Sequence, residues 1–226
     1  MKPSIPTPSK PLTPDEARAH EHAVAVRLTQ FEANAQANAR RITAPLQAPD
    51  QIKAFERILR SPRNARSKLL ALWAWLDEAG KHLAPATACR KGCAHCCHIA
   101  VGVTRPEAEL IAERTGHKMS KTTVQRGGDY AAGKPPGTAF ANVPWGYDHP
   151  CTFLKNGQCS IYDSRPTACR VYFNFDIDAL LCVLTPPETN PVPSWDATNV
   201  NLALMRIVGG PETQLADIRE FFPPEE

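Results

Sequence analysis

Apolar residues recur at helical spacing over three stretches in the first third of the chain. Thr13–Glu16 has the pattern of a capping box and predicts the start of a long helix that ends near Arg41. Asp50 can cap a second helix, which Pro62 ends. A third helix is expected over 67–83. Its apolar face is Leu69, Leu72, Trp73, Leu76 and Leu83. These faces predict the largest part of the buried core.

The rest of the chain mixes helix signals with one hairpin signal. Thr104–Glu107 is a second capping box, and it opens a helix that Gly116 ends. Residues 117–148 are polar and rich in glycine, so a long loop that could hold one short helical turn is expected. Asn156–Gly157 favours a tight turn and predicts a hairpin over 151–162. Further predictions are a short helix opened by 164–166, a strand at 171–175, and helices at 195–208 and 211–222.

Together these elements predict a small, mostly helical, irregular α+β protein with a short β-hairpin, held by a cysteine–metal cluster. Five of the 22 prolines fall in the first fourteen residues, which predicts a disordered tail. The predicted boundaries are a tail at 1–12, a helical extension at 13–62, a cysteine-cluster domain at 63–184 and a C-terminal helical extension at 185–226. The length of 226 residues suits one domain with such extensions.

Charge and hydropathy narrow the function classes. The net charge is +3 and the sequence holds no long run of like charges, so we expect no nucleic-acid binding. No segment approaches the roughly eighteen continuous apolar residues of a membrane span, and the N-terminus lacks a signal-peptide core. A cytoplasmic location is therefore expected. In that reducing compartment the eight cysteines are not expected to form disulfides.

Seven of the eight cysteines fall into two groups. Four lie within nine residues, and three follow much later: Cys89, Cys93, Cys96 and Cys97, then Cys151, Cys159 and Cys169. The two-residue gap between Cys93 and Cys96 lets one turn aim both sulfurs at one ion, as in structural zinc sites and iron–sulfur clusters. Metal shared by both groups would close the intervening loop. The sequence therefore predicts a thiolate site for zinc or iron.

The number of thiols is consistent with several types of metal site. One tetrahedral zinc needs four ligands, whereas two zinc ions that share a bridging thiolate would use seven. A four-iron cluster would use four and leave three thiols over. The adjacent pair Cys96–Cys97 favours more than one mononuclear site. His95 and His98 could replace a thiolate, although solvated histidines in a polar turn are the expectation.

The hairpin poses a geometric difficulty for two of the ligands. With a two-residue turn, Cys151 and Cys159 would point to opposite faces of the ribbon. We therefore expect a bulge, a three-residue loop, or pairing that begins after Cys151. Cys182 lies in an apolar run and is interpreted as a core thiol outside the site.

Four cations flank the cysteines: Arg90, Lys91, Arg165 and Arg170. Nearby positive charge would stabilise thiolates around a divalent ion and lower their pKa. The alternative is that these side chains are ordinary surface residues.

At these residues the chain resembles a known family, the bacterial YkgJ-type cysteine-cluster proteins, described as zinc- or iron-chelating domains. The resemblance rests on CRKGCAHCCHIAVGVTRPEAELIA at 89–112 and on CTFLKNGQCSIYDSRPTACRVYF at 151–173. It implies metal chelation by the seven cysteines of the two groups. Flagellin lysine methylases have a similar cluster, but the chain has no glycine-rich nucleotide loop, and no catalytic residue is assigned.

Three functions are consistent with these observations. The first is a cytoplasmic metalloprotein in which zinc or iron organises the fold. The second is an iron–sulfur enzyme acting in redox chemistry or protein modification. The third is a metal-stabilised adaptor whose N-terminal helix binds a protein partner, although the narrow apolar stripe of that helix favours packing on the protein itself.

Overall fold

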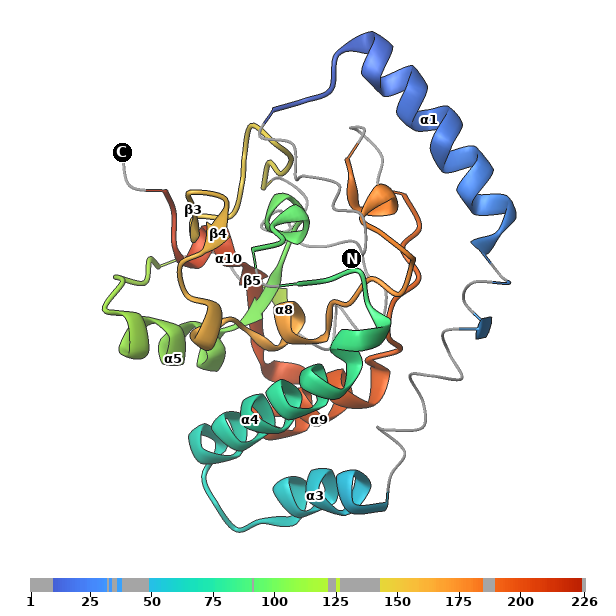
Figure 1. Cartoon of the computed structure of the whole chain (residues 1–226). Coiled ribbons are helices and arrows are strands. Elements are labelled where there is room, and N and C mark those ends of the chain that lie inside the picture. The colour runs from blue at the N-terminus through green and yellow to red at the C-terminus, as the bar shows by residue number, and fades with distance from the viewer. Residues whose placement is uncertain are drawn as a thin grey trace.

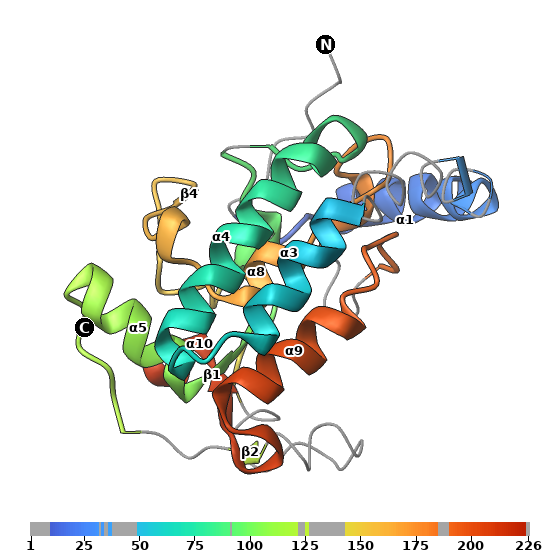
Figure 2. The ribbon, with the colours of Figure 1, turned by 90° about the horizontal axis from the view of Figure 1, so that it is seen from below.

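The computed structural model describes residues 10–31, 33, 36–37, 49–90, 92–121, 125–126, 143–184 and 190–224. The chain has the predicted α+β fold (Figure 1). Helices α3 (Pro49–Arg60), α4 (Ala65–Leu83) and α9 (Thr198–Val208) lie side by side, with α4 in contact with both others (Figure 2). Most of the predicted tail, residues 1–9, lies outside the described residues. None of the helices in the described ranges is long and apolar enough to cross a membrane.

Local capping signals set the helix starts. Both predicted capping boxes are confirmed, at Thr13 before α1 (Pro14–Thr29) and at Thr104 before α5 (Arg105–Thr115). α5 ends at Gly116, whose φ of 75° suits glycine. Helix α1 ends at Thr29 and a turn at Gln30 follows, but residues 31, 33, 36 and 37 are again helical. The predicted end near Arg41 lies outside the described residues.

Two other predicted starts shift by a few residues. α3 begins at Pro49, so Asp50 lies in its first turn instead of capping it. α4 begins earlier than predicted because the Asn64 side chain accepts a hydrogen bond from the Ser67 amide, 2.9 Å away. The predicted apolar face of α4 is confirmed, since all five of its residues are buried.

The C-terminal region forms a sheet that the sequence did not predict. Strand β5 (Gln214–Asp217) lies between β1 (Gly102–Thr104) and β2 (Gln125–Arg126), antiparallel to both. The predicted helix over 211–222 is therefore wrong. That stretch forms the 3₁₀ turn η5 (Gly210–Glu212), β5 and the short helix α10 (Ile218–Phe221). The backbone groups of β5 form hydrogen bonds with β1 and β2, which lie far away in the sequence. This pairing outweighs the local helix propensity of the segment. β2 likewise lies within the predicted 117–148 loop.

The predicted hairpin is confirmed. β3 (Leu154–Lys155) pairs with β4 (Gln158–Cys159), and Leu154 lies opposite Cys159. Asn156 and Gly157 both have positive φ, 50° and 71°, as a two-residue type I′ turn requires.

The segment after the hairpin contains the predicted helix but not the predicted strand. The turn η3 (Tyr162–Ser164) leads to the short helix α8 (Thr167–Val171), which confirms the predicted helix after Pro166. The strand predicted at 171–175 is wrong, because Val171 ends α8 and the next residues have no regular structure. There the Asn174 carbonyl accepts a hydrogen bond from the Ala88 amide, 2.8 Å away. This contact ties the segment to the first cysteine group instead of to a strand.

One apolar core joins elements from both ends of the chain. Residues that are completely buried come from α4, β1, α5, β5 and α10: Leu72, Val103, Ile111, Ala216 and Phe221. Cys151 belongs to this core, and Cys97, Cys159 and Cys169 pack against it.

Helix α1 packs against the body of the protein through an ion-pair cluster. The Arg27 guanidinium is 3.1 Å from both carboxylate oxygens of Asp178 and also pairs with the buried Asp176. This contact confirms the expectation that the helix packs on the protein. Although burial alone would raise it, hydrogen bonds from Arg27 and the Leu180 amide lower the pKa of Asp178.

We expect Arg27→Met to detach α1, because it leaves Asp176 buried without its cation, at a cost of roughly 3 kcal/mol. Faster hydrogen exchange at the α1 amides would report this loss. Because the Asp178 pKa is lowered on folding, its contribution is complete above a pH of about 4 and is lost as the pH falls further. Arg18→Met, at an exposed pair with Asp15, is the control and should not change the exchange. Equal exchange in all three proteins would contradict this account of docking.

Candidate metal centre

The first cysteine group lies on two consecutive tight turns. The Cys93 amide donates to the Arg90 carbonyl at 3.0 Å, and Gly92 takes the left-handed position of this turn with a φ of 87°. The 3₁₀ turn η2 (His95–His98) follows and carries Cys96 and Cys97. The predicted turn between Cys93 and Cys96 is therefore present.

Backbone hydrogen bonds join the first group to the second. The Cys151 amide donates to the Cys97 carbonyl at 2.6 Å, and the Gly146 amide donates to the His98 carbonyl at 2.9 Å. The two segments therefore lie side by side although they are far apart in the sequence. Cys151 precedes β3, so the alternation of side chains along the hairpin does not apply to it. This is one of the departures that the sequence predicted.

The seven predicted thiols line two adjoining cavities. A cavity of about 80 Å³ contains six of them: Cys93, Cys96, Cys97, Cys151, Cys159 and Cys169. Cys89 lines the next cavity together with Cys93, Cys96 and Cys169. The smaller cavity is large enough to hold metal ions between the surrounding sulfur atoms.

Cys182, interpreted from the sequence as a core thiol, lies beside the cluster. The Asn174 side chain donates to the Cys182 sulfur at 3.2 Å, and the Asn174 backbone amide donates to the Cys89 sulfur at 3.2 Å. Cys182 also shares a third cavity with Cys96 and His95. The spacing of Cys182 from the other cysteines matches no common metal motif. The only signal in the sequence was the total of eight cysteines, which is the number that two separate four-coordinate ions would need.

Burial controls the charge of these thiols. It raises the pKa of both Cys89 and Cys151 to about 11, and it raises the pKa of Cys169 well above the usual range. A hydrogen bond with Cys97, followed by burial, raises the pKa of Cys96. Without a cation these four thiols are therefore neutral. A bound metal would supply the positive charge that buried thiolates need.

Backbone amides partly offset this cost at three thiols. In each case the amide two residues after the cysteine donates to its sulfur: His95 to Cys93, Phe153 to Cys151 and Ile161 to Cys159. Donors in this position stabilise the thiolate and orient the sulfur. The turns therefore favour the ionised form that a metal requires.

Arg165 lies beside thiols of both groups. It lines both thiol cavities, stacks over Tyr162 at 3.9 Å, and lowers the pKa of Cys89 and Cys159 against the effect of burial. Its Nε is buried and has no hydrogen-bond partner among the described residues. Arg90 is exposed, and Lys91 lies outside the described residues. Arg165 is thus positioned to neutralise part of the charge of a metal–thiolate cluster.

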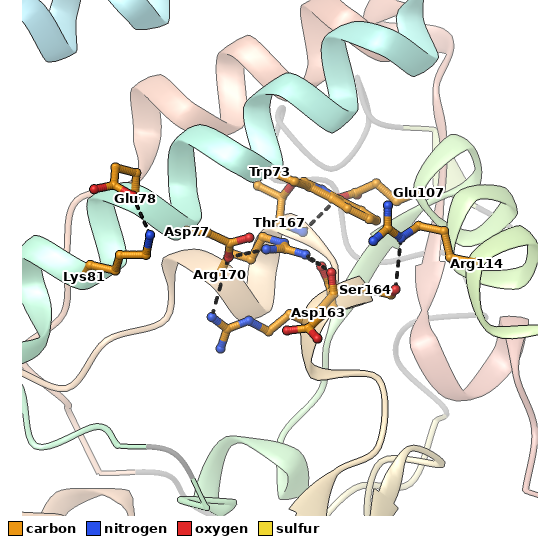
Figure 3. Close-up of polar contacts among 11 residues, drawn as sticks. Trp73, Asp77, Glu78, Lys81, Glu107, Arg114, Asp163, Ser164, Thr167 and Arg170 are labelled. Atoms are coloured by element: carbon orange, nitrogen blue, oxygen red, sulfur yellow. Dashed lines mark hydrogen bonds and ion pairs between the residues drawn. The ribbon is translucent and has the colours of Figure 1, made fainter.

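Arg170 has a different role, in holding helix α8 and its Cys169 in place. Its guanidinium pairs with Asp77, donates to the Asp163 carbonyl at 2.9 Å and lies over Trp73 at 4.7 Å (Figure 3). It is almost completely buried, so the alternative interpretation, an ordinary surface arginine, is wrong for this residue.

The start of α8 is fixed by a carboxylate from another helix. Glu107 completes the capping box of α5 and also accepts the Thr167 amide at 2.8 Å (Figure 3). The Trp73 indole donates to the Thr167 hydroxyl at 3.1 Å. Glu107 therefore caps two helices, and α4, α5 and α8 together set the position of Cys169.

Arg219 of α10 ties the two cysteine groups together. Its guanidinium donates to the Ile99 carbonyl at 3.1 Å and, through Nε, to the His149 carbonyl at 3.1 Å. It also pairs with the fully buried Asp217, which accepts the Val101 amide at 2.7 Å. Nothing in the local sequence indicated this role, because Arg219 lies outside both cysteine motifs.

The two histidines are buried rather than solvated, with 3% of His95 and 4% of His98 exposed. His98 Nδ1 is 3.3 Å from the Gly146 carbonyl, and its ring packs on Tyr147. Burial lowers the pKa of His98. The expectation of solvated turn histidines is therefore wrong, and His98 is part of the contact between the two cysteine segments.

All eight cysteines are free thiols, which agrees with the prediction of no disulfides. Within the described ranges, no three or more His, Cys, Asp or Glu side chains are arranged so that they could hold a metal ion as they stand. The thiols share cavities, but their side chains would have to rotate to complete a coordination sphere. The donor set itself, soft sulfur ligands supported by amide donors, fits zinc or iron.

Comparison with known proteins agrees with this assignment. Residues 88–186 match the model of the CxxCxxCC family, described as "Putative zinc- or iron-chelating domain". The matched region includes all eight cysteines, and it confirms the resemblance seen in the sequence. No curated protein and no solved structure matched the chain.

Proposed function

We propose that this chain, which carries a CxxCxxCC domain at 88–186, is a metal-binding protein in which cysteine thiolates hold zinc or iron and organise the fold. The observation that carries the proposal is the cavity lined by six thiols from both cysteine groups. Amide donors, Arg165 and the Arg219 contacts support the same geometry. The thiols would remain reduced in the cytoplasm, where we infer that the protein is located.

Electrostatic interactions connect seven of the thiols in two sets that share Cys96. Cys182 interacts electrostatically with Cys89, Cys93 and Cys96. Cys169 interacts with Cys96, Cys151 and Cys159. Cys96 is common to both sets and hydrogen-bonds to Cys97. We infer two ions with about four thiolates each, and Cys96 is the thiol best placed to belong to both sites.

Element analysis of purified variants tests this division. The native protein should hold two ions, while Cys151→Ser and Cys182→Ser should each retain about one. Cys96→Ser should lose most of both, because it removes the shared thiol. Ser194→Ala, at an exposed serine, is the control and should keep both ions. Full metal content in all three cysteine variants would contradict the proposed sites.

The identity of the metal follows from element analysis together with the colour of the anaerobically purified protein. Zinc has a filled d shell and gives a colourless protein whose metal stabilises the fold. An iron–sulfur cluster gives a brown protein and redox chemistry. A colourless zinc protein would exclude the iron–sulfur enzyme as an alternative.

A further inference from the structure

A groove lies between α3 and α4, two helices that pack side by side (Figure 2). Its volume is about 880 Å³, and it continues onto the loop between the two helices. The floor consists of small and apolar side chains: Ala54, Ile58, Ala71, Ala74 and Trp75. Trp75 packs on Phe55 and donates to the Gln51 carbonyl, so the two walls are held at a fixed separation.

The rim of the groove is strongly basic. Lys53, Arg57 and Arg60 follow one another at spacings of four and three along α3, which places them on one side of the helix. Arg63 adds a fourth cation, and Glu56 is the one carboxylate that lines the groove. Glu56 is 3.3 Å from Arg60. The other three cations form no ion pair with the residues that the structure describes.

The shape of the groove suits a helix. Ala71 and Ala74 have small side chains, so the backbone of another helix could approach α4 closely at this point. No residue of α3 is fully buried, and α3 therefore presents much of its surface to solvent. An apolar floor between two helices, with charges along its rim, is the arrangement that binds an amphipathic helix.

Charge complementarity identifies the occupant. A helix that fits must have an apolar face flanked by acidic residues. The longer segments of the chain outside the described residues do not qualify. Residues 1–9 and 38–48 contain no acidic residue, and 127–142 has one acidic and one basic residue. Phosphates of a nucleic acid would match the rim but not the apolar floor.

We propose that the α3–α4 groove binds an acidic amphipathic helix from a protein partner. This inference does not depend on the metal centre, since none of the eight cysteines lines the groove. It also places a partner site on α3, whereas the sequence suggested only the first helix.

A labelled synthetic helix tests the proposal against the full-length, metal-loaded protein. The probe has leucines along one face and glutamates beside them. One matched peptide replaces the glutamates with lysines, and another replaces the leucines with glutamines. Fluorescence anisotropy should show that the first peptide binds. The other two peptides should bind with affinities that are lower by roughly tenfold or more.

Variants locate the binding site. The double charge reversal Lys53→Glu with Arg57→Glu should weaken binding roughly tenfold, and Ala74→Trp should do the same by filling the floor. Lys155→Glu, at an exposed position of the hairpin, is the charge-matched control and should bind like the native protein. The proposal is overturned if no probe binds, if the three peptides bind equally, or if the variants leave the affinity unchanged. Displacement of the probe by a single-stranded oligonucleotide, or occupation of the groove by a second copy of the chain in light scattering, would also overturn it.

Discussion

Removal of the metal with a strong chelator should unfold the region that carries the cysteines and loosen the helices packed on it. A well-formed thiolate site contributes on the order of 10 kcal/mol to folding, which is comparable with the whole stability of a typical domain. Without metal, the buried thiols must stay neutral, and few regular elements hold their segments together. We expect a large loss of the helical circular dichroism signal and a red shift in the fluorescence of the buried Trp73.

Readdition of zinc or iron under reducing conditions provides the control, because it should restore both signals. The chelator should act slowly on the native protein, since the smaller thiol cavity is narrow and its cysteines are largely covered. A metal-free protein with unchanged helical signal and unchanged melting temperature would show that the fold does not depend on metal.

Arg219→Ala should destabilise the protein by about 3–5 kcal/mol, because it leaves the completely buried Asp217 without its cation. It also removes hydrogen bonds to carbonyl groups of both cysteine segments, at Ile99 and His149. Metal retention should therefore fall together with stability. Urea denaturation and element analysis of the same samples measure the two effects.

Arg206→Ala is the matched control for Arg219→Ala. Arg206 is exposed on α9, so its removal should change neither the free energy of unfolding nor the metal content. If Arg219→Ala lowered stability but kept full metal content, Arg219 would support the fold without aligning the thiols. If neither quantity changed, the proposed link between α10 and the metal centre would be wrong.

Local signals in the sequence were sufficient to predict the starts of α1 and α5 and the turn of the hairpin. Thr13 and Thr104 each form a capping box within four residues, and Asn156–Gly157 encodes its own turn. These features depend on contacts between near neighbours, so they can be identified without knowing the tertiary structure.

The wrong predictions have a common physical cause. The 211–222 segment looks helical by itself, but β5 is stabilised by pairing with β1 and β2, which lie far away in the sequence. The segment after Val171 has the composition of a strand, yet Asn174 bonds to the Ala88 amide and to the sulfurs of Cys89 and Cys182. Contacts across long sequence distances decide these conformations.

The same distinction applies to the metal centre. Cysteine spacing predicted the seven thiols that line the two adjoining cavities, because thiolate ligands in tight turns leave a pattern in the sequence. The residues that bring the two groups together leave no such pattern. Arg219 and Asn174 act from outside the cysteine motifs, and the proximity of Cys182 depends on the path of the chain after α8.

Cadmium–proton correlation NMR of cadmium-substituted protein tests the central claim most directly. Each cadmium signal correlates with the Hβ protons of the cysteines that bind that ion, so the spectrum reads the ligands residue by residue. The account predicts two cadmium signals, at least one of which connects a cysteine of 89–97 with a cysteine of 151–169. Signals that each connect cysteines of only one segment would contradict it.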